Sequence, residues 1–195
     1  AEYPFLQPWV DSLERTGALR DTVIFGAEGE RLHAMYAAAP RPTDRTAVIV
    51  HGYTDNAVRM LMIGYLYNHD LGYNILLPDL YYHGQSEGRA IRMGWKDRFD
   101  VLRWMEIAND IFGGDTRMVV HLDGRRDDDD GFGRGTAALC EMLRRGLRLH
   151  ERPGSVRQGV EGAVRAAGLS AARRGELAVR SEIRLELPRG FVAET

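Results

Sequence analysis

The segment Thr46-Ala-Val-Ile-Val-His-Gly-Tyr-Thr-Asp-Asn56 constrains the fold of this chain more than any other stretch. Its apolar run, Ala47–Val50 followed by His51, is typical of a strand buried on both faces of a parallel sheet. Gly52 has no Cβ, so the backbone can turn sharply there and bring an N–H group close to a ligand. We predict Asn56 as the N-cap of a helix. A strand, a glycine turn and a helix in this order place backbone N–H groups at the carboxyl edge of a sheet, where open α/β sheets bind ligands.

Hydrophobic periodicity predicts further elements on both sides of this segment. Helices are expected over 4–19, 56–70 and 96–112, a β-hairpin over 21–25 and 31–36, and strands over 74–80 and 117–121. Pro78 indicates the end of its strand rather than the middle. In the last helix, Phe99, Leu102, Met105 and Ala108 share one apolar stripe, with Val101, Trp104 and Ile111 beside it. The order β-β-β-α-β-α-β predicts an α/β fold with a parallel part.

Length and charge exclude several classes of protein. A chain of 195 residues is one domain with room for an appendage, and a net charge of −2 gives no reason to expect nucleic acid. No apolar run is long enough to span a bilayer. The single cysteine, Cys140, excludes an intrachain disulfide and a zinc site built from cysteines, and we predict no cofactor and no metal. The start, Ala1-Glu-Tyr-Pro, has no initiator Met and no signal-peptide pattern, although a removed leader would leave no trace.

Composition changes near His121. All Trp, Tyr, Asn and Lys residues lie at or before position 109, and after His121 the only aromatic residues are Phe132 and Phe191. The stretch 121–195 holds 14 Arg and 11 Gly. Residues 1–121 therefore read as a globular domain. Residues 122–195 read as a tail that cannot bury enough apolar surface to fold, and we expect this tail to be disordered.

Three motifs in order resemble the first half of an α/β-hydrolase of the serine aminopeptidase and esterase type. They are His51-Gly52-Tyr53 at a strand end, the strand Ile75-Leu-Leu-Pro-Asp-Leu80, and the loop His83-Gly-Gln-Ser-Glu-Gly88. The resemblance covers residues 20–121 and implies a partial α/β-hydrolase sheet, with an N-terminal hairpin followed by parallel strands and flanking helices. It also implies a small-molecule or peptide substrate cleaved at an ester or amide bond, and a bacterial protein that is exported or membrane-associated.

The resemblance implies an oxyanion site at His51, Gly52 and Tyr53, with the backbone N–H of Tyr53 as the donor. A fixed N–H aimed at the developing oxyanion is worth about 10²–10³ in rate. The alternative interpretation is that His51-Gly52 only ends a strand. Ser86 lies too close to His83 in sequence to face it as a nucleophile, so we interpret it as a turn residue. The run Asp127–Asp130 lacks the spacing of a calcium loop and is interpreted as a solvated charge run.

The nucleophile of the resembled family is missing. The family places it in Gly-x-Ser-x-Gly on the turn after the strand that here ends at His121, but the chain continues Leu122-Asp-Gly-Arg-Arg126. Read one base later, codons for 121–126 can encode Ile-Ser-Met-Gly-Ala-Ala, which restores the motif. The hypothesis is that residues from about His121 onward are an out-of-frame translation of a hydrolase gene. The alternative is a genuine Arg/Gly-rich tail.

Two functions follow, and they belong to different classes. The first is a serine hydrolase by ancestry, which in this chain is inactive because it lacks the nucleophile and its triad partners. The second is a non-catalytic pseudo-enzyme or interaction protein whose tail, with 14 Arg against 5 Asp and 7 Glu, binds a partner. We also expect the strand at 117–121 to be an exposed edge through which the chain self-associates, and the strands at 47–50 and 75–77 to be partly bare.

Overall fold

The computed structural model describes residues 4–92, 96–114 and 116–123, and the backbone of 182–185. Its elements, in chain order, are α1 (Leu6–Arg15), β1 (Leu19–Phe25), β2 (Arg31–Ala37), β3 (Arg45–Val50), α2 (Leu61–Tyr65), the π-helical segment η1 (Leu66–Asp70), β4 (Asn74–Pro78), α3 (Asp97–Ile111), β5 (Arg117–Leu122) and β6 (Glu182–Leu185). The predicted hairpin, strands and helices are all present, and β4 ends at Pro78 as predicted.

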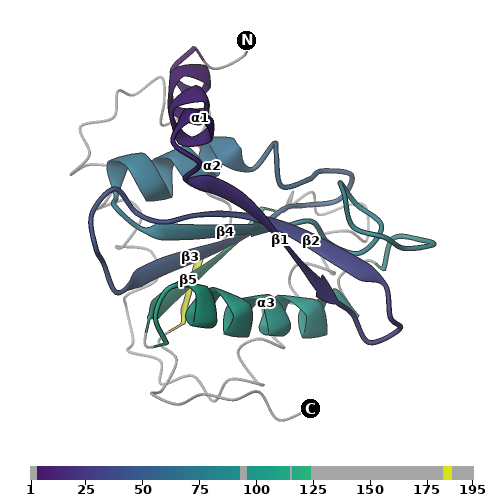
Figure 1. Ribbon diagram of the computed structural model, residues 1–195. Helices are drawn as coiled ribbons and strands as arrows, with labels where there is room; N and C mark the ends of the chain where they lie inside the picture. The colour runs from purple at the N-terminus through teal and green to yellow at the C-terminus, as the bar shows by residue number, and fades with distance from the viewer. Residues whose placement is uncertain (1–3, 93–95, 115, 124–181, 186–195) are drawn as a thin grey trace.

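The strands form one mixed sheet in the order β1-β2-β4-β3-β5-β6. The three inner strands β4, β3 and β5 are parallel, whereas β1, β2 and β6 pair in antiparallel fashion. Helices α1 and α2 lie on one face of the sheet and α3 on the other (Figure 1). The predicted α/β class, a mixed sheet with flanking helices, is therefore confirmed for the described residues.

Side-chain alternation along β3 explains the two-sided core. Ala47 and Ile49 pack with residues of α1 and α2, and Val48 and Val50 pack with residues of α3. Successive residues of a strand point to opposite faces, so a strand covered on both sides is apolar at every position. The expectation that β3 and β4 are partly bare is wrong, because 47–50 and 75–77 are at most 1 % exposed.

Two helices differ from the prediction in detail. The side chain of Asn56 accepts the N–H of Arg59, as an N-cap does, but the regular helix begins only at Leu61. In α3 the buried apolar face is Val101, Trp104, Met105 and Ala108, while Phe99 is 57 % exposed. Two adjacent apolar stripes have the same period, so the sequence pattern alone does not choose between them. No helix of the described part is long and apolar enough to cross a membrane.

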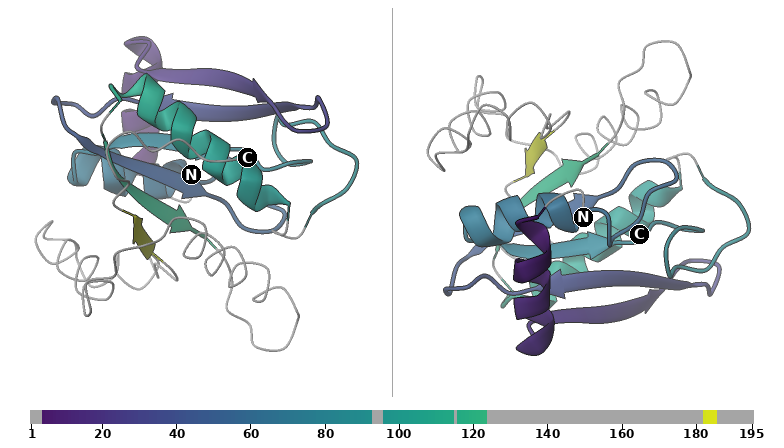
Figure 2. Two further views of the ribbon diagram at one scale, coloured as in Figure 1. Left: turned by 90° about the horizontal axis from the view of Figure 1, so that it is seen from below. Right: turned by 90° about the horizontal axis from the view of Figure 1, so that it is seen from above.

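The expectation that β5 is an edge strand is wrong. The segment Glu182–Leu185 pairs antiparallel with Met118–His121, and Figure 2 shows β6 beside β5. The free edge on this side of the sheet therefore belongs to β6, and 182–185 lie in a strand although we expected the whole stretch 122–195 to lack structure. The remaining tail residues, 124–181 and 186–195, lie outside the described residues. Self-association through a sheet edge stays a prediction.

Candidate functional site

The carboxyl ends of β3 and β5 lie side by side. The backbone N–H of Asp123, just after β5, donates to the carbonyl of Val50 at 2.9 Å. The chain leaves β3 toward β4 through α2 and returns through α3 to β5 on the other side of β3. This reversal of strand order is the position where open α/β sheets form a ligand-binding crevice. Gly52 and Tyr53 follow β3 at this crevice, as the sequence predicted.

His51 is buried and uses both ring nitrogens structurally. Its Nε2 accepts the backbone N–H of Leu80 at 3.0 Å, so the ring proton must be on Nδ1, which donates to the carbonyl of Gly52 at 2.7 Å. Burial lowers the pKa of His51, which keeps the ring neutral. The imidazole therefore fastens the end of β3 to the end of β4, and its two nitrogens are not available for proton transfer to a substrate.

Two non-glycine residues with positive φ lie at this same edge. Thr54, after β3, has φ of 59°, and Tyr82, after β4, has φ of 62°; they are the only such residues in the described part of the chain. Each conformation costs on the order of 1–3 kcal/mol, and such strain concentrates at functional sites. In the first turn the hydroxyl of Thr54 donates to the carbonyl of Tyr53 at 2.7 Å, and the N–H of Asp55 donates to that of Gly52 at 3.3 Å.

Asp79 joins the two loops that follow β3 and β4. Its carboxylate accepts the N–H of Ala57 at 2.7 Å, the N–H of Gln85 at 3.0 Å, and Nδ1 of His33 at 2.8 Å. The other ring nitrogen of His33 lies 2.8 Å from the carboxylate of Asp21. Burial alone would raise the pKa of Asp79, but the hydrogen bonds from His33, Ala57 and Gln85 outweigh it and lower this pKa. Asp79 is therefore an ionised hub at the site.

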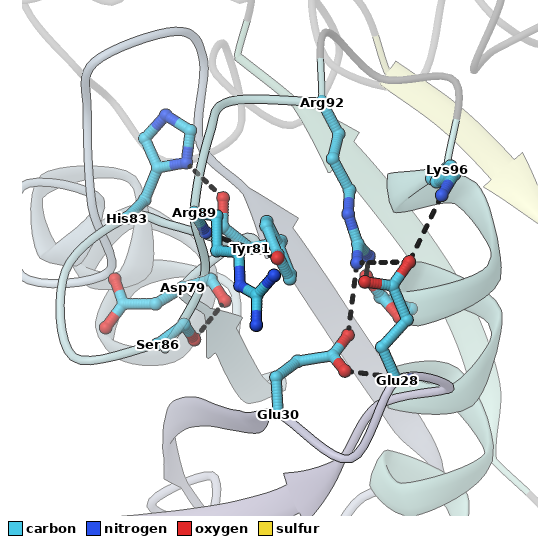
Figure 3. Close-up of polar contacts among 10 residues, drawn as sticks. Glu28, Glu30, Asp79, Tyr81, His83, Ser86, Arg89, Arg92 and Lys96 are labelled. Carbon is cyan, nitrogen blue, oxygen red and sulfur yellow. Dashed lines mark hydrogen bonds and ion pairs between the residues drawn. The ribbon is translucent and has the colours of Figure 1, made fainter.

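The loop 83–88 is structural, as predicted for Ser86. The Ser86 hydroxyl donates to the carbonyl of Asp79 at 2.7 Å and accepts the N–H of His33 at 2.8 Å. His83 donates through Nδ1 to the carbonyl of Tyr81 at 2.9 Å (Figure 3). The buried Nε2 of His83 has no hydrogen-bond partner among the described residues. Neither Ser86 nor His83 is arranged as a nucleophile–base pair.

Arg92 holds the loop after β4 against the hairpin and α3 (Figure 3). Its guanidinium stacks over the ring of Tyr81, with its carbon 3.4 Å from the ring centroid. It also forms ion pairs with three carboxylates, those of Glu28, Glu30 and Asp100, at 3.3, 3.3 and 3.5 Å. Burial raises the pKa of Asp100 to about 7 despite the nearby Arg92. The sequence did not indicate this cluster, because its members come from three separate elements.

The end of β5 carries no nucleophile in the described residues. His121 is 1 % exposed, and its Nδ1 lies 3.5 Å from the hydroxyl of Tyr67, which is a long contact for a hydrogen bond. Burial lowers the pKa of His121 to about 4. Leu122 is also 1 % exposed. Cys140, His150 and the run Asp127–Asp130 lie outside the described residues. Among the described side chains, no group of three or more His, Cys, Asp or Glu could hold a metal ion.

Comparison with known proteins gives partial matches. No family model matches the chain. The uncharacterized protein YqkD of Bacillus subtilis strain 168 is 38 % identical over 66 residues, which are 34 % of this chain and 21 % of that protein. This chain therefore spans about a fifth of the curated relative.

Three solved structures are also similar. An esterase of Pyrococcus furiosus, Pf2001, has a TM-score of 0.49 at 21 % identity, over 57 % of this chain and 42 % of that one. A serine hydrolase homologue from Coxiella burnetii has 0.48 at 16 %, over 64 % and 56 %. Est1E from Butyrivibrio proteoclasticus, solved with ferulic acid, has 0.47 at 21 %, over 64 % and 48 %. At this level of similarity, the chemistry of the site has to be argued from its own residues.

Proposed function

We propose that the described part of the chain is the N-terminal part of an α/β-hydrolase catalytic domain, of the type that cleaves esters or amides with a serine nucleophile. The observation that carries the proposal is the contact between the ends of β3 and β5, where Asp123 N–H meets the carbonyl of Val50 at 2.9 Å. It sets the glycine turn after β3 beside the turn after β5. The resembled family has its nucleophile elbow on the latter turn.

The proposed role of Tyr53 is to donate its backbone N–H to the oxyanion formed during acyl transfer. Such a donor works because it is held in place before charge develops, so no reorganisation is needed during the reaction. Gly52 lets a substrate approach the backbone. His51 acts as a positioning residue, because its bonds to Leu80 and to the carbonyl of Gly52 hold the turn in one orientation. The substrate would be a small ester, an amide or a peptide.

The out-of-frame hypothesis gains support from the surroundings of His121. This side chain points to the face of β5 that packs with α2, where Tyr67 and Val119 belong to an apolar cluster. A buried imidazole with one long contact is costly, whereas the isoleucine of the shifted reading would suit the same cluster. In that reading position 122 is serine, which falls directly after the strand.

The alternative, a non-catalytic interaction protein, is favoured by Leu122. This side chain is buried in the core on the α3 side, where a nucleophile elbow would have to expose a serine. A protein with this residue would keep the sheet and use another surface for binding.

An active-site fluorophosphonate probe and a nitrophenyl ester test the catalytic state of this chain. We expect neither labelling nor turnover, because a triad enzyme without its nucleophile keeps only the modest rate that binding and an oxyanion hole supply. Labelling of any serine would show that the chain as it stands is an active hydrolase. Turnover that Ser86→Ala abolishes would show that the structural role of Ser86 is wrong.

A further inference from the structure

His33 lies between two carboxylates on the second strand of the sheet. Its side chain is buried, with Asp79 at 2.8 Å from Nδ1 and Asp21 at 2.8 Å from Nε2. Asp79 is 3 % exposed, whereas the side chain of Asp21 is 65 % exposed. From β1 the ring faces Asp21, and from the end of β4 it faces Asp79; the loop 83–88 contributes only the uncharged hydroxyl of Ser86, which binds the backbone of His33.

This arrangement needs a proton on both ring nitrogens. An ionised carboxylate only accepts hydrogen bonds, so a neutral imidazole could satisfy one partner and would present a lone pair to the other. Asp79 already accepts two backbone N–H groups and stays ionised. The hydrogen bond to Asp79 accordingly raises the pKa of His33 above its ordinary value, against the opposing effect of burial. The ring is an imidazolium near neutral pH.

The carboxylate that His33 holds also fixes two loops at the carboxyl edge. One bond reaches Ala57, which closes the turn that begins at Gly52, and the other reaches Gln85 in the loop after β4. Gly84 lets that loop come close: its φ is +52°, and a Cβ there would run into the Asp79 carboxylate. The orientation of Asp79 therefore decides where both loops lie.

We propose that the Asp21–His33–Asp79 triad is a proton-dependent clamp, in which His33 acts through Asp79 as the positioning residue of the turn at Gly52 and Tyr53. Loss of one proton from His33 replaces an attractive N–H···O contact by repulsion between a lone pair and a carboxylate. The clamp then loosens at Ala57 and Gln85 together. The inference rests on the proposed function only for the statement that this turn carries an oxyanion donor.

The sign of the pH effect follows from the direction of the pKa shift. Because the pKa of His33 is raised in the folded state, its contribution is complete below the pKa of the unfolded chain, about 6.5, and is lost as pH rises through the folded-state value. The clamp should therefore be closed at pH 6 and open progressively in alkaline solution.

The test is amide hydrogen exchange of the full chain by NMR between pH 6 and 9.5, with ring-nitrogen shifts of the histidines recorded in parallel. We expect both ring nitrogens of His33 to be protonated at pH 7. Protection of Ala57 and Gln85, corrected for intrinsic rates, should fall by about tenfold or more through the His33 midpoint, since each unit of pKa shift corresponds to a tenfold factor. Asp21→Asn should lower this midpoint but keep the step.

His33→Gln should lower protection of both amides at pH 6 and remove the step, whereas His69→Gln, at an exposed ring bonded to Asp70, should change neither. A neutral His33 ring at pH 6 in the unmodified chain would overturn the proposal, and so would a step that survives His33→Gln. These readouts do not involve a nucleophile, so the clamp can stand if fluorophosphonate experiments refute the hydrolase, and can fail if they support it.

Discussion

The backbone N–H of Leu80 donates to Nε2 of His51 across 3.0 Å, so a side chain fastens the end of β3 to the residue that follows the neighbouring strand. His51→Ala removes the acceptor and leaves a buried N–H unpaired. An unsatisfied buried donor costs about 1–3 kcal/mol, and we expect the free energy of unfolding to fall by that amount in denaturant titrations. His69→Ala, at an exposed histidine, is the control and should change little. Equal effects of the two substitutions would argue that the His51 contact is not stabilising.

Gly84→Ala tests the packing of the loop on Asp79. Alanine at this position meets both an unfavourable φ of +52° and the Asp79 carboxylate. Gly17→Ala is the matched control, because Gly17 has φ of +65° and nothing within 4 Å of the added methyl. We expect about 1–2 kcal/mol of destabilisation at Gly17 from the left-handed backbone and a further ~1–3 kcal/mol at Gly84 from overpacking. A Gly84→Ala chain as stable as Gly17→Ala would show that the loop is not held against Asp79.

His121→Ile tests how the end of β5 tolerates its imidazole. Burial lowers the pKa of His121 to about 4, so the unfolded chain binds this proton more readily and stability falls as pH drops below about 6.5. We expect His121→Ile to remove this acid sensitivity and to raise the free energy of unfolding at pH 5 by on the order of 2 kcal/mol. Denaturant titrations at pH 7 and pH 5 give the measurement. A variant less stable at both pH values would mean that the site prefers the imidazole.

Asp100→Asn tests the carboxylate beneath Arg92. Burial raises the pKa of Asp100 to about 7, so the folded chain binds its proton more readily and stability falls as pH rises from about 4 through 7. The amide cannot ionise, and we expect Asp100→Asn to be more stable than the unmodified chain at pH 8 by at least ~1 kcal/mol. Thermal unfolding at pH 5 and pH 8 is the measurement. Destabilisation at pH 8 would show that the ion pair with Arg92 outweighs the burial of the charge.

Local patterns predicted the parts of the fold that depend on neighbours in sequence. The buried strand before Gly52, the end of β4 at Pro78 and the span of α3 all follow from hydrophobic period and backbone restrictions. The pairing of β6 with β5 did not follow, because its two partners lie about 60 residues apart and Glu182–Leu185 is a short segment inside an Arg-rich stretch.

The candidate site was predicted in position but not in its supports. His51, Gly52 and Tyr53 were found because they are consecutive. The contact between His33 and Asp79 joins residues 46 apart, and that between Arg92 and Glu30 joins residues 62 apart. Such contacts depend on how β2 and β4 pair, which a single sequence does not specify. An available signal was the aspartate after Pro78, since a carboxylate directly after a buried strand needs partners.

The central claim is that the chain carries the N-terminal part of a serine hydrolase whose nucleophile is lost by a change of reading frame near His121. The most direct measurement is the coding DNA across codon 121, followed by fluorophosphonate labelling of the protein translated one base later from that point. The account predicts codons that read Ile-Ser-Met-Gly in the shifted frame and a protein labelled at the serine of position 122. Codons that forbid this reading, or a shifted-frame protein that folds but is not labelled, would contradict it.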